Sequence, residues 1–62
     1  MALRLVVSMV KDNARVDVRK DADTGEFVAM LYRDGCHVEA ADYFDDDRDS
    51  TVQTARFMLQ AV

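Results

Sequence analysis

The residues best suited to nucleophilic chemistry are Cys36 and His37, which are adjacent and are the sole cysteine and histidine of the chain. An imidazole beside a thiol can take the thiol proton and so create a nucleophile. However, this segment has the pattern of a β-strand, in which neighbouring side chains point to opposite faces of the sheet. The two groups therefore cannot form a catalytic pair. Because the sequence also lacks a glycine-rich phosphate loop, we expect no enzyme and no catalytic residues.

The aspartates Asp45, Asp47 and Asp49 have the spacing of the first three ligands in an EF-hand calcium loop. The rest of that loop is missing, because Ser50 stands at the position of its glycine and Arg56 at that of its closing glutamate. A zinc site needs several cysteine or histidine ligands, which this sequence does not supply. We therefore expect no metal ion and no cofactor.

Acidic side chains are concentrated between residues 39 and 49, where six carboxylates fall within eleven positions and only Arg48 opposes them. One interpretation is a solvated loop that keeps the chain soluble and caps a following helix. The other is an anionic surface that docks on a basic surface of a larger protein, since such patches speed association in a salt-sensitive way. On this second interpretation the candidate partner-binding residues are Glu39, Asp42, Tyr43, Asp45, Asp46, Asp47 and Asp49.

Two aromatic residues, Tyr43 and Phe44, lie inside this acidic run. Aromatic side chains are frequent anchors of protein interfaces, so we assign that role to Tyr43. In the alternative, one of the two packs beneath the start of the helix as a hydrophobic staple, and we favour Phe44 for that position.

Four segments have the pattern of β-strands, because they are short, rich in β-branched or aromatic residues and separated by polar turns. They are Leu3–Val10, Arg15–Arg19, Glu26–Arg33 and Cys36–Ala41. Between the last two, Asp34 and Gly35 are typical of a two-residue type I′ hairpin turn. This turn predicts that Tyr32 faces His37 across the hairpin.

The C-terminal segment has apolar residues at helical spacing, which predicts a helix with one apolar stripe. The stripe consists of Val52, Ala55, Met58, Leu59 and Val62, and Phe57 lies off it. Ser50 and Gln53 fit a capping box at the start of this helix. In the alternative, Asp46 or Asp47 caps a helix that begins one turn earlier.

The order ββββα predicts an α+β fold, a four-stranded antiparallel β meander with one C-terminal helix packed on one face. The chain is short enough that we expect a single domain over residues 1–62. One face of the sheet is apolar and predicts the core, with Phe27, Ala29, Leu31, Val38 and Ala40.

The second face of the sheet cannot be covered by the same helix. It carries Val28, Met30 and Tyr32, which we predict to contact a second copy of the chain or another partner. On the second strand, Arg15 and Arg19 flank an aspartate on this face, which we interpret as the solvated face of an edge strand.

The chain has 62 residues, with 12 acidic against 8 basic side chains and a net charge of -4. This balance argues against direct binding to nucleic acid or to an anionic membrane, both of which need cationic surface. One cysteine cannot close an internal disulfide. The apolar run at residues 1–10 is shorter than a membrane span of about 20 residues and lacks the features of a signal peptide. We expect a cytoplasmic protein.

Three stretches carry a resemblance: GEFVAMLYRDG at 25–35, ADYFDDD at 41–47 and TAR at 54–56. Together they resemble small sheet-plus-helix proteins encoded by phages and mobile elements, some of which are anti-CRISPR inhibitors. The resemblance implies a phage-type inhibitor that binds a host effector and blocks its access to nucleic acid. The hairpin-then-helix layout is also similar to partner domains of HicB-type antitoxins.

Two functional hypotheses follow. The first is a small acidic inhibitor or regulator that docks on a basic surface of a larger nucleic-acid-handling protein. The second is a structural homodimer or antitoxin-type partner domain, in which the acidic run serves only solubility and helix capping.

Overall fold

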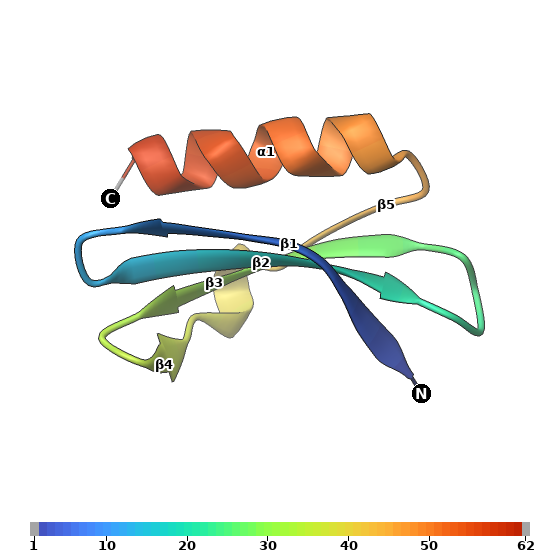
Figure 1. Ribbon diagram of the computed structural model, residues 1–62, viewed down its shortest axis with the longest axis horizontal. Helices are drawn as coiled ribbons and strands as arrows, with labels where there is room; N and C mark the ends of the chain where they lie inside the picture. The colour runs from blue at the N-terminus through green and yellow to red at the C-terminus, as the bar shows by residue number, and fades with distance from the viewer. Residues whose placement is uncertain (1, 62) are drawn as a thin grey trace.

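The structure, a computed structural model, describes residues 2–61 and shows an antiparallel sheet with one helix lying along one face (Figure 1). The strands are β1 (Leu3–Lys11), β2 (Ala14–Asp21), β3 (Phe27–Arg33), β4 (Cys36–His37) and β5 (Tyr43–Asp45). A short 3-10 turn, η1 (Glu39–Ala41), separates β4 from β5, and the helix α1 covers Arg48–Gln60. Because β1 to β4 lie side by side in chain order, the predicted α+β fold with a C-terminal helix on an antiparallel meander is confirmed.

The fourth strand of the sheet is broken in two, so its predicted extent over Cys36–Ala41 is wrong. β4 pairs with the end of β3 through His37 and Tyr32. β5 pairs with the beginning of β3 through Tyr43 and Ala29. Between these two pairings the chain holds three residues more than an unbroken strand would need.

The residues within the break explain it. η1 consists of one glutamate and two alanines, which have low β-propensity. The backbone N–H groups of Ala41 and Asp42 donate to the carbonyls of Val38 and Glu39, both at 3.1 Å. Because the three extra residues are an odd number, the residues that follow exchange sheet faces relative to the prediction. Ala40, which we predicted in the core, is exposed.

The hairpin turn between β3 and β4 has the predicted type I′ geometry. Its two residues have positive φ, 54° at Asp34 and 80° at Gly35. The Asp34 N–H also donates to the carbonyl of Asn13 at 2.9 Å, and the side chains of these two residues are hydrogen-bonded. The β1–β2 turn and the β3–β4 turn are thereby joined at one end of the sheet.

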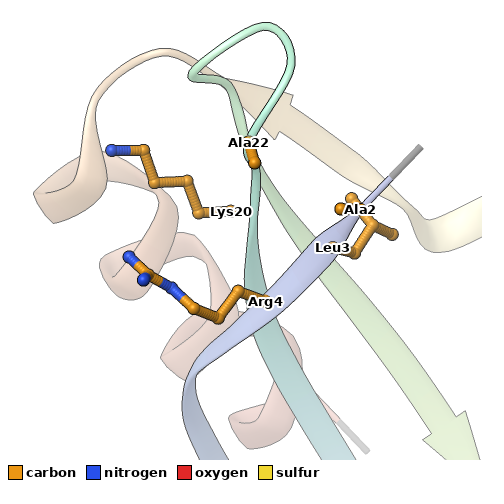
Figure 2. Close-up of a pocket in the computed structure, with 5 residues that line it drawn as sticks. All are labelled: Ala2, Leu3, Arg4, Lys20 and Ala22. Atoms are coloured by element: carbon orange, nitrogen blue, oxygen red, sulfur yellow. The ribbon is translucent and has the colours of Figure 1, made fainter.

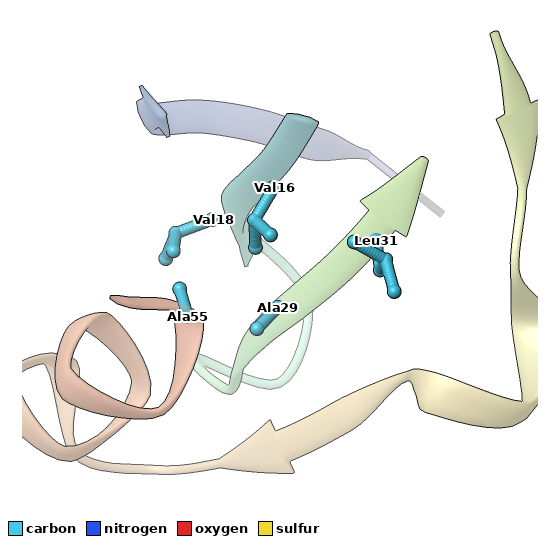
Figure 3. Packing of buried hydrophobic residues seen from close by; sticks show 5 residues of the cluster. All are labelled: Val16, Val18, Ala29, Leu31 and Ala55. Atoms are coloured by element: carbon cyan, nitrogen blue, oxygen red, sulfur yellow. The ribbon is translucent and has the colours of Figure 1, made fainter. Parts of the chain in front are cut away.

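The hydrophobic core lies between the helix and the sheet. Its fully or almost fully buried members are Val16, Val18, Ala29, Leu31 and Ala55 (Figure 3). Val52, Met58 and Leu59 from the predicted helical stripe pack against this cluster. The last member of the stripe, Val62, lies outside the described residues. Phe57 is 70% exposed, which confirms that it lies off the stripe.

The helix begins after Asp47, as in the second of the two predicted alternatives. The Asp47 carboxylate accepts the backbone N–H of Ser50 at 2.9 Å and the Ser50 hydroxyl at 2.7 Å. Ser50 therefore lies inside the helix, and the capping box predicted from it is wrong. The staple prediction for Phe44 is also wrong, because Phe44 is 60% exposed and Tyr43 packs against the core instead.

Candidate protein-binding face

A buried carboxylate lies near the centre of the sheet face that the helix leaves uncovered. Asp17 on β2 is 3% exposed and accepts the Ser8 hydroxyl at 2.7 Å. The Arg15 Nε and the Arg19 Nη2 lie 3.2 Å and 3.4 Å from its two oxygens. The prediction of a solvated edge strand is therefore wrong, since β2 lies between β1 and β3 and its aspartate is buried among polar partners.

Aromatic and charged side chains form a connected row on the same face. The guanidinium carbon of Arg15 lies 4.3 Å from the centre of the Tyr32 ring. Tyr32 stacks on His37, with ring centroids 5.1 Å apart and planes inclined by 30°, which confirms the predicted cross-strand pair. His37 Nε2 lies 2.8 Å from Asp42 Oδ1. This contact holds Asp42, which follows η1, against the end of the sheet.

An apolar hollow of about 190 Å³ lies beside this row on the uncovered face. Its lining consists of Leu3, Asp21, Glu26, Val28, Met30, Asp42 and Phe44. The pairing of the strands places Phe44 next to Val28, and Leu3 next to Asp21. We call this feature the acidic-rimmed hollow, because three of its lining residues are carboxylates and the other four are apolar.

Among residues 2–61, no lysine or arginine lines the acidic-rimmed hollow. Arg19 lies opposite Val28, one of the lining residues, in the pairing of β2 with β3. The buried Asp17 carboxylate holds the Arg19 guanidinium at 3.4 Å. The charges of Asp21, Glu26 and Asp42 are thus not neutralised by a cation in the lining.

The predicted second-face residues have different exposures. Val28, which we predicted to contact a second copy or another partner, is 4% exposed, so the chain itself already covers most of it. Met30 and Tyr32 are half-buried, and Tyr32 is already covered by Arg15 and His37. The broken fourth strand and the row of side chains thus cover part of the face that we expected a second copy or another partner to contact.

Two carboxylates of the acidic run stabilise the start of the helix. Asp45 accepts the Tyr43 hydroxyl at 2.7 Å and the backbone N–H of Asp47 at 3.0 Å. The hydrogen bond from Tyr43, followed by that from the Asp47 backbone, lowers the pKa of Asp45 below its usual value. The same hydrogen bond, together with burial and the negative charge of Asp45, raises the pKa of Tyr43.

The acidic run therefore does not form one surface. Asp42 joins the acidic-rimmed hollow, whereas Asp45 and Asp47 contact the backbone near the helix start. Glu39, Asp46 and Asp49 are exposed. The sequence did not point to Leu3 on β1, Asp21 at the end of β2 or Glu26 just before β3 as members of this site. Alternation along β2 could have identified Asp21, because Asp21 lies four residues after Asp17 and therefore on the same face of the sheet.

A second hollow, of about 540 Å³, lies at one end of the sheet and has the opposite charge. Arg4 and Lys20 are paired across β1 and β2, and their side chains extend to the same side in Figure 2. The Lys20 ammonium lies 5.6 Å from the centre of the Phe27 ring. These cations are on the opposite side of the sheet from the acidic-rimmed hollow.

No family model, no curated protein and no solved structure matches this chain. Within residues 2–61, no group of three or more histidine, cysteine or acidic side chains is placed to hold a metal ion. None of the helical segments in that range is long and apolar enough to cross a membrane.

Proposed function

We propose that this chain is a small protein-interaction module, an inhibitor or regulator that docks on a basic surface of a larger protein. The observation that carries the proposal is the acidic-rimmed hollow, in which apolar surface and three carboxylates occur together without a lysine or arginine among the described lining residues. Apolar area removed from water supplies affinity, at about 25 cal/mol per Å². The surrounding carboxylates favour a cationic partner and speed its approach.

Phe44 is the side chain best placed to anchor the partner. It is 60% exposed, lines the hollow and stands beside Asp42. Burial of a large aromatic side chain at the centre of an interface is typical of energetically dominant residues. The anchor that we predicted at Tyr43 therefore moves by one residue, because Tyr43 packs against the core.

The class of partner follows from charge. Proteins that handle nucleic acid present lysine and arginine side chains to neutralise phosphates. A chain with a net charge of -4 that binds such a surface would compete with the nucleic acid for it. This supports an inhibitor of a nucleic-acid-binding effector, which is also what the resemblance to phage-encoded proteins implies.

The test compares affinity capture by two matched double variants, using a lysate of the cells in which the chain is naturally produced. Asp42→Asn/Phe44→Ala changes the hollow, whereas Asp49→Asn/Phe57→Ala removes the same residue types from the exposed side of the helix. We expect wild type and the helix variant to capture the same protein, released by salt, and the hollow variant to lose it. Equal capture by both variants, or no capture by wild type, would refute the proposal.

The second candidate is a homodimer, and exposed apolar residues on the edge strand β1 favour it. Leu5 and Val10 are 49% and 70% exposed. An edge strand offers unpaired backbone groups to another strand, and a short domain gains stability by self-association. Light scattering should then show twice the chain mass, and Val10→Lys should restore the monomer. A monomeric wild type at high concentration excludes this candidate.

A further inference from the structure

We infer that the acidic-rimmed hollow is a receptor for a single arginine side chain of the partner protein. This inference rests on the proposed function, because it names the group that a basic partner would insert. The hollow combines an apolar floor, an exposed aromatic ring and three carboxylates at its rim. An arginine side chain offers the matching parts, an aliphatic stem and a planar cation that stacks on rings and donates to carboxylates.

The floor of the hollow suits the stem of the side chain. Val28 and Met30 project from β3 onto the uncovered face, since the intervening Ala29 is buried in the core. Val28 is almost fully buried and held by the pairing of β3 with β2 and β5. The floor is therefore preformed, and little conformational entropy would be lost there when a ligand binds.

The rim of the hollow suits the guanidinium. Asp42 is positioned by its 2.8 Å contact with His37. Asp21 is positioned by a local turn, in which its Oδ1 accepts the backbone N–H of Asp23 at 2.8 Å. Glu26 is exposed and lines the same hollow. Asp21 and Glu26 lie opposite each other, because the Asp21 N–H donates to the Glu26 carbonyl at 2.8 Å. Their carboxylates can share the five N–H donors of one guanidinium, whereas Asp42 lies at the Met30 end of the hollow and adds negative charge there.

Phe44 favours arginine over lysine at this site. Its ring is 60% exposed and lines the hollow. A guanidinium stacks on an aromatic face while its N–H groups, which lie in its own plane, stay free to donate to carboxylates, whereas an ammonium is a compact, strongly hydrated charge. The Arg15–Tyr32 pair, at 4.3 Å, shows the same type of contact elsewhere on this face.

The experiment is an NMR chemical-shift titration of the full chain with blocked peptides Gly-Ser-X-Ser-Gly. X is arginine, its uncharged isostere citrulline, or lysine, so one side chain differs each time. We expect the arginine peptide to shift the amides of Val28, Met30 and Phe44 and to bind about 10-fold more tightly than the citrulline peptide, because charge-assisted hydrogen bonds are lost in citrulline. The lysine peptide should bind about 2–5-fold more weakly than the arginine peptide, because it loses the stacking.

Matched variants localise the effect. Glu26→Gln is expected to weaken arginine binding about 2–5-fold, as for an exposed ion pair, whereas Glu39→Gln, at another exposed glutamate, should leave it unchanged. Phe44→Ala should weaken it about 5-fold and reduce the preference over lysine, whereas Phe57→Ala should not. Equal binding of the arginine and citrulline peptides, or shifts outside the hollow only, would overturn the inference. Equal binding of arginine and lysine would overturn the assignment to a guanidinium.

Failure of this inference can be distinguished from failure of the proposed function. If the peptides do not discriminate but Asp42→Asn/Phe44→Ala still abolishes capture of a partner, the module docks through this face without an arginine receptor. If the arginine peptide binds in the hollow but no partner is captured, the receptor is supported and the proposed function is overturned.

Discussion

Replacing the buried Asp17 by alanine is expected to lower the free energy of unfolding by about 2 kcal/mol, because a hydrogen bond to a charged group contributes about 1.5–3 kcal/mol. The Ser8 hydroxyl loses an acceptor at 2.7 Å. Arg15 and Arg19 lose their counterion, but their side chains are 47% and 30% exposed, so water can hydrate both cations. The loss of stability is therefore smaller than that for a fully buried charge left without its partner, which is about 3–5 kcal/mol.

This loss is large relative to the total, since a chain of 62 residues has a stability of about 3–9 kcal/mol. Urea denaturation followed by far-UV circular dichroism measures the difference in stability between wild type and Asp17→Ala, provided that the denaturant slopes of the two proteins agree. At about 4–8 °C per kcal/mol for small domains, Tm should fall by about 8–16 °C.

Two further variants isolate the cause of the loss. Asp17→Asn keeps an acceptor for Ser8 but removes the charge, and it should cost about 1 kcal/mol. A double-mutant cycle of Asp17→Ala with Ser8→Ala should show a coupling of at least about 0.5 kcal/mol, because the two residues are in direct contact. An unchanged midpoint for Asp17→Ala, or a cycle without coupling, would refute the reasoning that this buried network stabilises the sheet.

Three further predictions concern the turn and the start of the helix. Asp47→Ala removes the helix cap and should cost about 1 kcal/mol in urea denaturation. Gly35→Ala places a side chain at a φ of 80° and should lower stability by about 1 kcal/mol in the same assay, although no neighbouring atom crowds the added carbon. An unchanged midpoint in either variant would contradict these expectations. Because the pKa of Tyr43 is raised in the folded state, its hydroxyl contributes stability below pH 10.0, and this stability is lost as the pH rises through the pKa of the folded state. Because the pKa of Asp45 is lowered in the folded state, its carboxylate contributes stability above pH 3.8, and this stability is lost as the pH falls through the pKa of the folded state. Tyr43→Phe should therefore flatten the pH dependence of thermal unfolding at both extremes, whereas curves parallel to wild type would show that the hydroxyl contact does not stabilise the fold.

The parts of the fold that local chemistry determines could be predicted from the sequence. The Asp34–Gly35 pair predicts a type I′ turn because both positions need positive φ, and the turn then determines which residue faces Tyr32. The apolar stripe of the helix identifies the side that packs on the sheet, including Ala55 at the centre of the core. In these cases the deciding interactions lie within one turn or one helical face.

The parts that depend on competition between elements could not be predicted in the same way. The residues of η1 do not contain a glycine or proline that marks the end of a strand. The break arises because weak β-propensity there competes with pairing along β3, and the sequence pattern alone does not give the outcome. Asp17 is a similar case, because its burial depends on Ser8 from a neighbouring strand as much as on the arginines beside it.

The break in the fourth strand determines which side chains line the uncovered face. If β4 continued without interruption, its alternation would place Ala40 towards the helix and Glu39 next to Met30 on the uncovered face. The three extra residues instead bring Tyr43 to the core side and Phe44 to the uncovered side. The same insertion lets Asp42 reach back to His37. A change that costs the sheet part of its edge pairing thus places an aromatic ring and a positioned carboxylate beside the apolar floor, and a regular strand would have supplied neither of them.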